Sequence, residues 1–339
     1  MKETLRHATT LDLWRIVATG QRQRVLHLNP PYTLVQPESA FSELFRAQVP
    51  ARRKVSFVYV YAEGGSLLGY IQIKCRWRKY DEWAISTIAV SDRAGEHVWE
   101  ALLEHACKEA GERGATRLSV KIPKGEPLQE AFRTLGFTHY TDERIWGNLL
   151  LATSDVPKRE PDPKPLRRQN NSDAWDLMQL YTAITPPAVR RAEELTTRQW
   201  RRSSGPRFPF LSRSMVEKAY VWPDEATNKG GLGGYARLLS GVRGHWITFM
   251  FRHEGENRAH IPHALNYVLW KASRLGHKPV YCGIREYQSE AEAPLQDRGF
   301  HPLSEQELLV KYLVRPIPVR QPALVPFLVP RDEGVGVRG

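Results

Sequence analysis

The spacing of apolar residues alternates between a helical and a strand period, and the same succession occurs twice. In the first half the helical patterns cover residues 11–19 and 101–114, and the strand patterns cover 55–62, 67–75 and 83–90. In the second half the helical patterns cover 174–183 and 264–276, and the strand patterns cover 218–222, 234–240 and 246–251. Each long helix precedes an apolar strand, a short helix ending in Gly-Phe, and a last strand, predicted at 145–151 and 308–314. These patterns predict two α/β units, each a mixed, mostly antiparallel sheet flanked by helices.

Several landmarks recur at one spacing of 163 residues, and the pairs are Trp83 with Trp246, Ala101 with Ala264, and Gly136 with Gly299. A shared spacing of this kind indicates an internal duplication. It predicts that the two halves superpose, with Trp83 on Trp246. It also predicts that the helix faces containing Leu103 and Leu269 are buried against their sheets.

Prolines mark the predicted boundaries between the units. Residues 154–170 combine prolines with charges of both signs, which is typical of a linker and unsuited to a core element. We therefore predict a first domain at 1–153, the linker at 154–170, a second domain at 171–315 and a Pro-rich extended tail at 316–339.

The chain is basic, with 49 Lys and Arg against 37 Asp and Glu, a net charge of +12. This balance favours anionic partners such as nucleic acid or a phosphorylated cofactor. One local run, Arg76-Trp77-Arg78-Lys79, combines cations with an aromatic ring that can stack on bases. The competing interpretation is a solvated Arg-rich surface, and we favour it over nucleic-acid binding.

Other features exclude whole classes of protein. No apolar run approaches the roughly 20 residues that span a bilayer, and the first residues lack the apolar core of a secretory signal. The three cysteines, Cys75, Cys107 and Cys282, are far apart and lack metal-ligand spacing, which argues against a disulfide framework and a zinc site. We expect a cytoplasmic protein without a metal and with cysteines in the core.

The first half resembles the GNAT (Gcn5-related N-acetyltransferase) family through the segments Ile88–Gly95, Ala101–Ala106, Glu112–Leu118 and Gly136-Phe137. The second half resembles it through Trp246–Phe251, Ala264–Gly276, Pro279–Ile284 and Gly299-Phe300. The resemblance implies two tandem GNAT-like domains. Known tandem members include acetyltransferases and transferases that take their acyl group from tRNA.

The resemblance also implies a site for acetyl-CoA or another acyl-CoA. In the family, a glycine-containing loop and the N-terminus of the long helix hold the pyrophosphate, and the pantetheine arm lies beside the preceding strand. The matching positions in this sequence are Ile88, Val90, Arg93, Gly95, Glu96, His97 and Val98. The loops are degenerate: His97 and Trp99 replace residues that are usually small, and the second loop, 252–262, keeps the spacing without the glycines.

The catalytic residues that the family implies are only partly present. The tyrosine that protonates the leaving thiolate in many members is replaced by Phe132 and Leu295. Glu82 at the start of its strand, and His245 at 163 residues beyond, are candidate bases. Tyr140 and Tyr287 are candidate replacements for the acid.

Three functions remain open at this stage. The first is an acyl-CoA-dependent N-acyltransferase that modifies a small-molecule or peptide amine, with the cofactor in the first half. The second is a non-catalytic module that retains the fold for binding or assembly. The third is an aminoacyl-tRNA-dependent transferase, suggested by the tandem organisation and the positive charge. The sequence identifies neither the acceptor nor the oligomeric state.

Overall fold

The computed structural model describes residues 3–19, 23–28, 34–35, 56–76, 79–91, 94–149, 156–157, 159–162, 164–201, 216–224, 231–252 and 259–313. The predicted tail at 316–339 lies outside these ranges, as do Trp77, Arg78 and Arg93. Within them, no helix is both long and apolar enough to cross a lipid bilayer.

The first half of the chain forms β1 (Glu3–His7), α1 (Thr10–Thr19), β2 (Gln23–His27), β3 (Ser56–Glu63), β4 (Ser66–Arg76), β5 (Lys79–Ser91), α4 (Glu96–Glu112), β6 (Arg117–Pro123), α5 (Leu128–Thr134) and β7 (Thr138–Asn148). The second half forms β8 (Arg167–Arg168), α6 (Ala174–Ile184), α7 (Pro187–Glu193), α8 (Thr197–Trp200), β9 (Val216–Pro223), β10 (Leu232–Ser240), β11 (His245–Phe251), α9 (His260–Ser273), β12 (Val280–Arg285), the 3₁₀ helix η3 (Glu286–Ala291), α10 (Glu292–Gln296) and β13 (His301–Tyr312). The predicted order of long helix, strand, short helix and last strand is present in both halves.

The two long helices form where the apolar period predicts them. In α4, residues Val98, Leu102 and Ala106 recur on one face and are buried in the core beneath the helix. The chain leaves the helix through Gly114, whose φ of 87° lies in the left-handed region that glycine adopts most readily. Gly276 has the same role after α9, with a φ of 118°.

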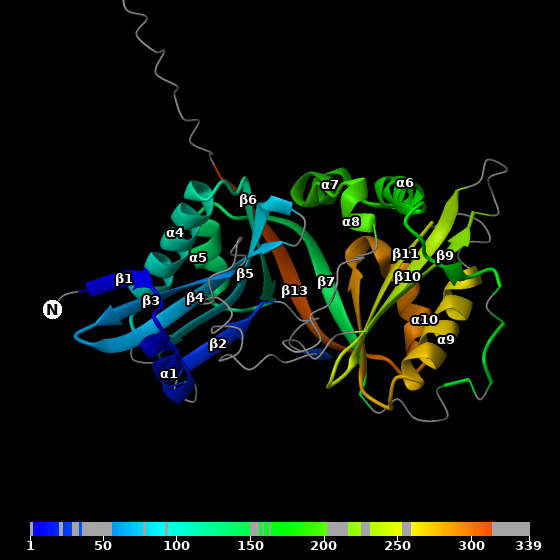
Figure 1. Cartoon of the computed structure of the whole chain (residues 1–339), viewed down its shortest axis with the longest axis horizontal. Helices are drawn as coiled ribbons and strands as arrows, with labels where there is room; N and C mark the ends of the chain where they lie inside the picture. The colour runs from blue at the N-terminus through cyan, green and yellow to red at the C-terminus, as the bar shows by residue number, and fades with distance from the viewer. Residues whose placement is uncertain are drawn as a thin grey trace, which may run out of the picture.

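All of the described strands join one sheet, in the order β1-β3-β4-β5-β6-β13-β7-β12-β11-β10-β9-β8, with β2 paired to β5 outside this path. The two halves therefore exchange their last strands: β13 pairs with β6 of the first half, and β7 pairs with β12 of the second. Figure 1 shows β7 and β13 side by side at the centre of the molecule. The prediction that each half is closed by its own last strand is wrong, because an apolar pattern specifies a strand without specifying its neighbour.

The exchange gives the sheet an approximate twofold relation. In the central pair, Glu143 of β7 faces Gln306 of β13, and these two residues are separated by the same 163 positions as the sequence landmarks. The strands flanking this pair match in order on either side, from β6 to β1 and from β12 to β8. The duplication inferred from the sequence is therefore present in the arrangement of the strands.

The predicted superposition of Trp83 on Trp246 is wrong by one residue. Trp83 belongs to the core beneath α4, whereas Trp246 packs on the other face of the sheet with Val35 and Ile145. The position that corresponds to Trp83 is held by His245, whose imidazole lies on the α9 face of the sheet with Nε2 2.9 Å from the carbonyl of Gly276. A one-residue offset is enough to move a side chain to the opposite face of a strand.

A second repeat, unnoticed in the sequence, joins the first strand of each half to its first helix. Arg6 forms a bidentate pair with Asp12, at 2.5 and 3.0 Å, and the amide of Thr9 donates to the same carboxylate. Arg167 pairs in the same way with Asp173, at 2.9 and 2.7 Å. Each carboxylate also accepts from the backbone amide three residues earlier, so it fixes the start of its helix.

Leu103→Ala and Leu269→Ala should each lower the free energy of unfolding by about 2–5 kcal/mol, because both side chains are fully buried and truncation leaves cavities. Chemical denaturation measures the loss. Leu11→Ala is the control, since the side chain of Leu11 is 75% exposed. Equal stabilities for all three variants would contradict the assigned helix faces.

Asp12 should make stability depend on pH. Burial raises the pKa of its carboxyl, but the hydrogen bonds from Arg6 and Thr9 outweigh burial and lower the pKa from 3.8 to about 2. A pKa that is lower in the folded state contributes stability above the unfolded value, and this contribution, about 2 kcal/mol, is lost as the pH falls toward 2. Denaturation midpoints between pH 5 and pH 2 should therefore fall less steeply for Asp12→Asn than for the unchanged protein. If the midpoints of the two proteins fell in parallel with pH, the Arg6–Asp12 pair would not be the source of the pH dependence.

Candidate functional site

Two parallel strands of the first half separate at their carboxyl ends. β5 pairs with β6 only where Glu82–Ala84 faces Arg117–Ser119, and beyond this point β5 continues to Ser91 without β6. A bulge at Ser86, an extra residue opposite Gln72 and Ile73, accompanies the separation. In the second half β11 and β12 separate in the same way after Ile247 and Cys282. The pairing of β11 with β10, however, contains no bulge within the described strands.

The N-terminus of α4 lies directly after the free end of β5. Gly95 is extended, with φ −70° and ψ 168°, and the helix begins at Glu96. A Cβ on Gly95 would meet Nδ1 of His97 at 2.7 Å, so the exposed imidazole of His97 lies against this glycine. Trp99 packs against the core beneath α4. Because the first amides of a helix lack intrahelical acceptors, this end of α4 can receive an anion. The side chain of Glu96 and all of Arg93 lie outside the described part of the chain.

The edge of β5 that faces the separation is paired with β2. Gln23–His27 runs antiparallel to Thr87–Ser91, and the amide of Leu28 donates to the carbonyl of Ser86 at 2.9 Å. Leu28 is buried in the same core as Ile88 and Val90, which are themselves buried. Sequence reasoning missed β2, although the short apolar run Val25-Leu26-His27-Leu28 before two prolines was a signal for a strand.

The structure does not bring the three candidate catalytic residues together. Glu82 is buried in β5 beside Arg117, and Tyr140 lies in β7, with β6 and β13 between the two strands. His245 lies in β11 beyond β12. Its imidazole is fully buried with Nε2 2.9 Å from the carbonyl of Gly276, and burial lowers the pKa of the ring.

The positions where the family carries a tyrosine are apolar core. Phe132 and Leu295 are both almost completely buried, in the cores beneath α4 and α9 respectively. Tyr287, the other candidate acid, lies in η3, and burial raises the pKa of its hydroxyl. Tyr140 is the extra residue of a bulge in β7, opposite Leu308 and Leu309 of β13, and its side chain is half-buried.

A buried polar cluster at the junction between the halves was not predicted from the sequence. On the sheet face beneath α7, Glu143 contacts Nζ of Lys121 at 2.7 Å and accepts a hydrogen bond from Gln306. Burial raises the pKa of the Glu143 carboxyl, but the nearby charges of Lys121 and Arg285 outweigh it and lower the pKa overall. Arg285 also contacts Glu193 of α7 at 2.6 Å. The cluster therefore balances buried charges from both halves.

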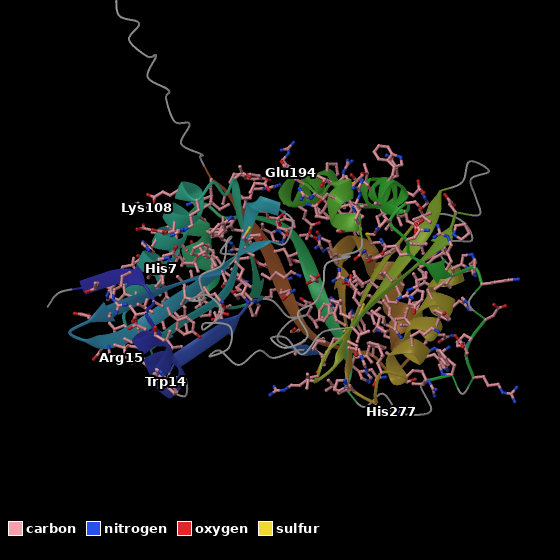
Figure 2. The ribbon with its side chains drawn as sticks, in the orientation of Figure 1. His7, Trp14, Arg15, Lys108, Glu194 and His277 are labelled. Atoms are coloured by element: carbon pink, nitrogen blue, oxygen red, sulfur yellow. The ribbon has the colours of Figure 1, made fainter. Side chains whose placement is uncertain are left out.

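A second contact on the same face joins α7 to the first half. Arg117 of β6 is almost completely buried, and its Nη2 lies 2.8 Å from Oε2 of Glu194. Glu194 follows α7 and has a φ of 38°, in the left-handed region. Figure 2 shows Glu194 at the end of α7 that faces the first half. An uncommon backbone conformation thus places a carboxylate on a buried guanidinium.

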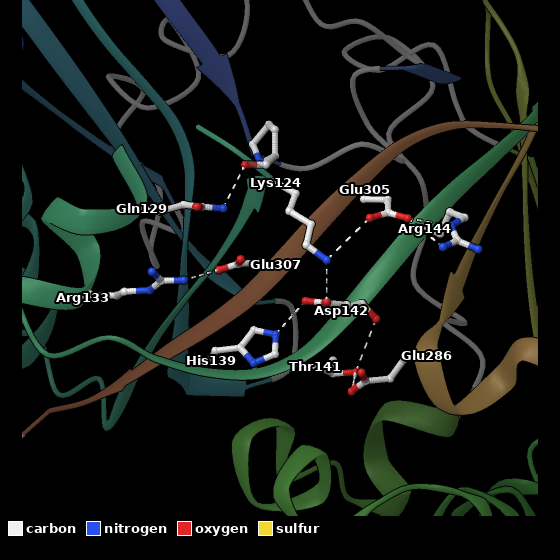
Figure 3. A network of polar contacts seen from close by, with 11 residues as sticks. Lys124, Gln129, Arg133, His139, Thr141, Asp142, Arg144, Glu286, Glu305 and Glu307 are labelled. Atoms are coloured by element: carbon white, nitrogen blue, oxygen red, sulfur yellow. Dashed lines mark hydrogen bonds and ion pairs between the residues drawn. The ribbon is translucent and has the colours of Figure 1, made fainter. Parts of the chain in front are cut away.

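The other face of the junction carries a partly exposed ionic network, most of which is drawn in Figure 3. Its contacts are Arg133 with Glu307 at 3.2 Å, Lys124 with Asp142 at 3.2 Å, Lys124 with Glu305 at 3.6 Å, Arg144 with Glu305 at 2.7 Å, and Arg144 with Glu292 at 3.0 Å. The network links α5 of the first half, the two exchanged strands and α10 of the second half. Among the described residues no group of three or more His, Cys, Asp or Glu side chains is placed to hold a metal ion.

Comparison with known proteins identifies the fold. Residues 23–137 match the model of the acetyltransferase (GNAT) family. A tandem GNAT protein from the clavulanic acid biosynthesis pathway has the same fold, with 14% identity, a TM-score of 0.52, and coverage of 92% of this chain and 98% of that one. A GCN5-related N-acetyltransferase from Sphaerobacter thermophilus is similar at 15% identity, with a TM-score of 0.53 and coverage of 93% and 96%. No curated protein matches the sequence significantly. The chain has a tandem GNAT fold, as the sequence predicted.

Removing one partner of the buried cluster should destabilise both halves together. Lys121→Met should lower the free energy of unfolding by about 3 kcal/mol, because Glu143 loses its nearest cation while it stays buried. Adding Glu143→Leu to this variant should restore part of the loss, since an apolar pair removes the buried charge. The control is Lys108→Met on the exposed surface of α4 (Figure 2). Calorimetry showing no difference between Lys121→Met and Lys108→Met would contradict the role of the cluster.

Proposed function

We propose that this protein is an acyl-CoA-dependent N-acyltransferase that holds its acyl-CoA in the first half. The observation that carries the proposal is the separation of β5 from β6 directly before the N-terminus of α4, within the segment that matches the GNAT family model. Acyl-CoA supplies a thioester whose acyl group passes to an amine. The acceptor class we propose is a small-molecule or peptide amine.

The proposed cofactor site uses backbone and side-chain groups of one continuous segment. The pantetheine arm would lie along the β5 edge formed by Ile88 and Val90, whose apolar side chains are fixed in the core. The pyrophosphate would lie over residues 95–98 at the start of α4, where the N-terminus of the helix favours an anion. His97 is exposed there, and Arg93 and Glu96 belong to the same loop.

We propose Glu82 as the base that takes a proton from the acceptor amine, directly or through water. It is the one of the three candidates that lies on a strand bordering this separation, near the point where β5 leaves β6. Its side chain points to the sheet face opposite α4, since Trp83 beside it points toward α4. We assign no general acid, because Phe132 fills the position of the family's tyrosine.

A non-catalytic binding or assembly module is the second candidate function. Two observations favour it: the strand β2 on the β5 edge, and the apolar core at the tyrosine position. The two functions differ in whether acyl-CoA binds and whether an amine is then modified. A module of this kind would retain the exchanged sheet and lack turnover with any amine.

His97→Asp tests the proposed site without disturbing the fold. A carboxylate in the first turn of a helix is compatible with the helix dipole, but it should weaken acetyl-CoA binding about tenfold or more by repelling the pyrophosphate. Isothermal titration measures the affinity. His260→Asp, in the first turn of α9 and 163 positions beyond His97, is the control and should leave the affinity unchanged. No heat with the unchanged protein at millimolar acetyl-CoA would reject the enzyme hypothesis.

A further inference from the structure

We propose that β2 is a built-in competitor of the cofactor, a strand that must leave the β5 edge before acyl-CoA can bind to the first half. This inference rests on the proposed function. It adds a conformational step to binding that neither the fold nor the family match implies. Its starting point is that one short strand pairs with β5 on the edge left free by the separation of β6.

The pairing register identifies the backbone groups that β2 covers. The amide of Leu28 donates to the carbonyl of Ser86, and Leu26 faces Ile88 two positions further along the same antiparallel pair. Hydrogen-bonded pairs alternate in an antiparallel ladder, so the polar groups of Ile88 and then Val90 also point toward β2. These are the groups that the proposed function gives to the pantetheine arm. A ligand and β2 cannot use them at the same time.

The side chains of Leu26 in β2 and of Leu28 directly after it reinforce this competition. Leu28 is 3% exposed and is part of the core that contains Ile88, Val90 and Leu102. Leu26 is half-buried and packs against the same core. The strand therefore covers apolar surface beside β5 in addition to pairing with its backbone.

The length and the pairing of β2 also favour its displacement. It has five residues, β5 is its only pairing partner among the described strands, and it lies outside the continuous order of strands. A short strand paired on one side contributes little to the stability of the sheet. Departure of β2 would expose one edge of β5, and an extended pantetheine arm would then occupy that edge. The other strands of the sheet need not rearrange.

The consequence for affinity follows from mass action. When only a fraction of the molecules has β2 detached, the apparent dissociation constant equals the intrinsic one divided by that fraction. If β2 is paired in nine molecules of ten or more, detaching it permanently tightens acyl-CoA binding by about tenfold or more. Weakening β2 should therefore increase the affinity, which is the opposite of what damage to a binding site would cause.

Leu26→Pro is the main test, because proline removes the amide that the alternation directs at β5 and is excluded from a ladder at such a position. Leu28→Ser is the second, since it removes the buried anchor and leaves the backbone intact. Thr4→Pro is the matched control: it interrupts β1, an edge strand of the same length that pairs with β3 away from the separation. Isothermal titration with acetyl-CoA should give an affinity at least tenfold tighter for Leu26→Pro, tighter for Leu28→Ser and unchanged for Thr4→Pro.

Hydrogen exchange of the unchanged protein gives an independent readout. Saturating acetyl-CoA should increase exchange at the amides of Arg24, Leu26 and Leu28, which face β5, while the amides of Thr87 and Ala89, which face β4, remain protected. Protection of Arg24, Leu26 and Leu28 in the bound state, or equal affinities for the unchanged protein and both β2 variants, would overturn the competition and leave the proposed function in place. Absence of acetyl-CoA binding in every variant would overturn the proposed function, and the competition with it.

Discussion

The exchange of β7 and β13 is the constraint on which the rest of the structure depends. Each of these strands begins in one half and completes the sheet of the other, so β6 and β12 obtain their second neighbours from across the molecule. The charges that hold the junction are arranged around this exchange, with Glu143 opposite Gln306 at its centre. Because a buried carboxylate is costly without partners, the contact with Lys121 fixes the central pair in one register.

The candidate site depends on the same constraint. β6 can turn away from β5 because β13 pairs with it along Arg117–Pro123. The separation that we assign to acyl-CoA therefore rests on a strand supplied by the second half, even though all of the proposed ligand contacts come from the first. This connection gives the second half a role in the site without requiring it to bind a cofactor.

The sequence predicted the positions of the helices and strands better than it predicted which strands pair with one another. The helical period and the terminal glycines located α4 and α9, and the two Gly-Phe pairs located the turns before β7 and β13. Periodicity does not report which strands become neighbours, so the exchange was missed. The landmark Trp83–Trp246 was misleading because loops of different length shift the register by one residue, and one residue changes the face of a strand.

The candidate site was predictable to a similar degree. The family resemblance located the end of β5 and the start of α4, because a glycine before an amphipathic helix is a local signal. It did not predict β2, whose partner is more than 60 residues away along the chain. The Glu143 cluster was also missed. Charged residues within strands, such as Glu143 and Arg285, are expected to be exposed, and only the neighbouring exchanged strand and the covering helix α7 show that they are buried.

The exchange also sets an order of events during synthesis on the ribosome. Val120 of β6 faces Leu309 of β13, so its partner is translated about 190 residues later. At the usual elongation rates of about 5–20 residues per second, the nascent first half waits roughly 10–40 seconds with that edge uncovered. An uncovered strand edge is a template for wrong pairing, and β7 is the nearest strand available to fill it. Completion of the native sheet then requires β13 to insert between β6 and β7, which makes the last of the described strands to be translated the one that commits the whole chain to its topology.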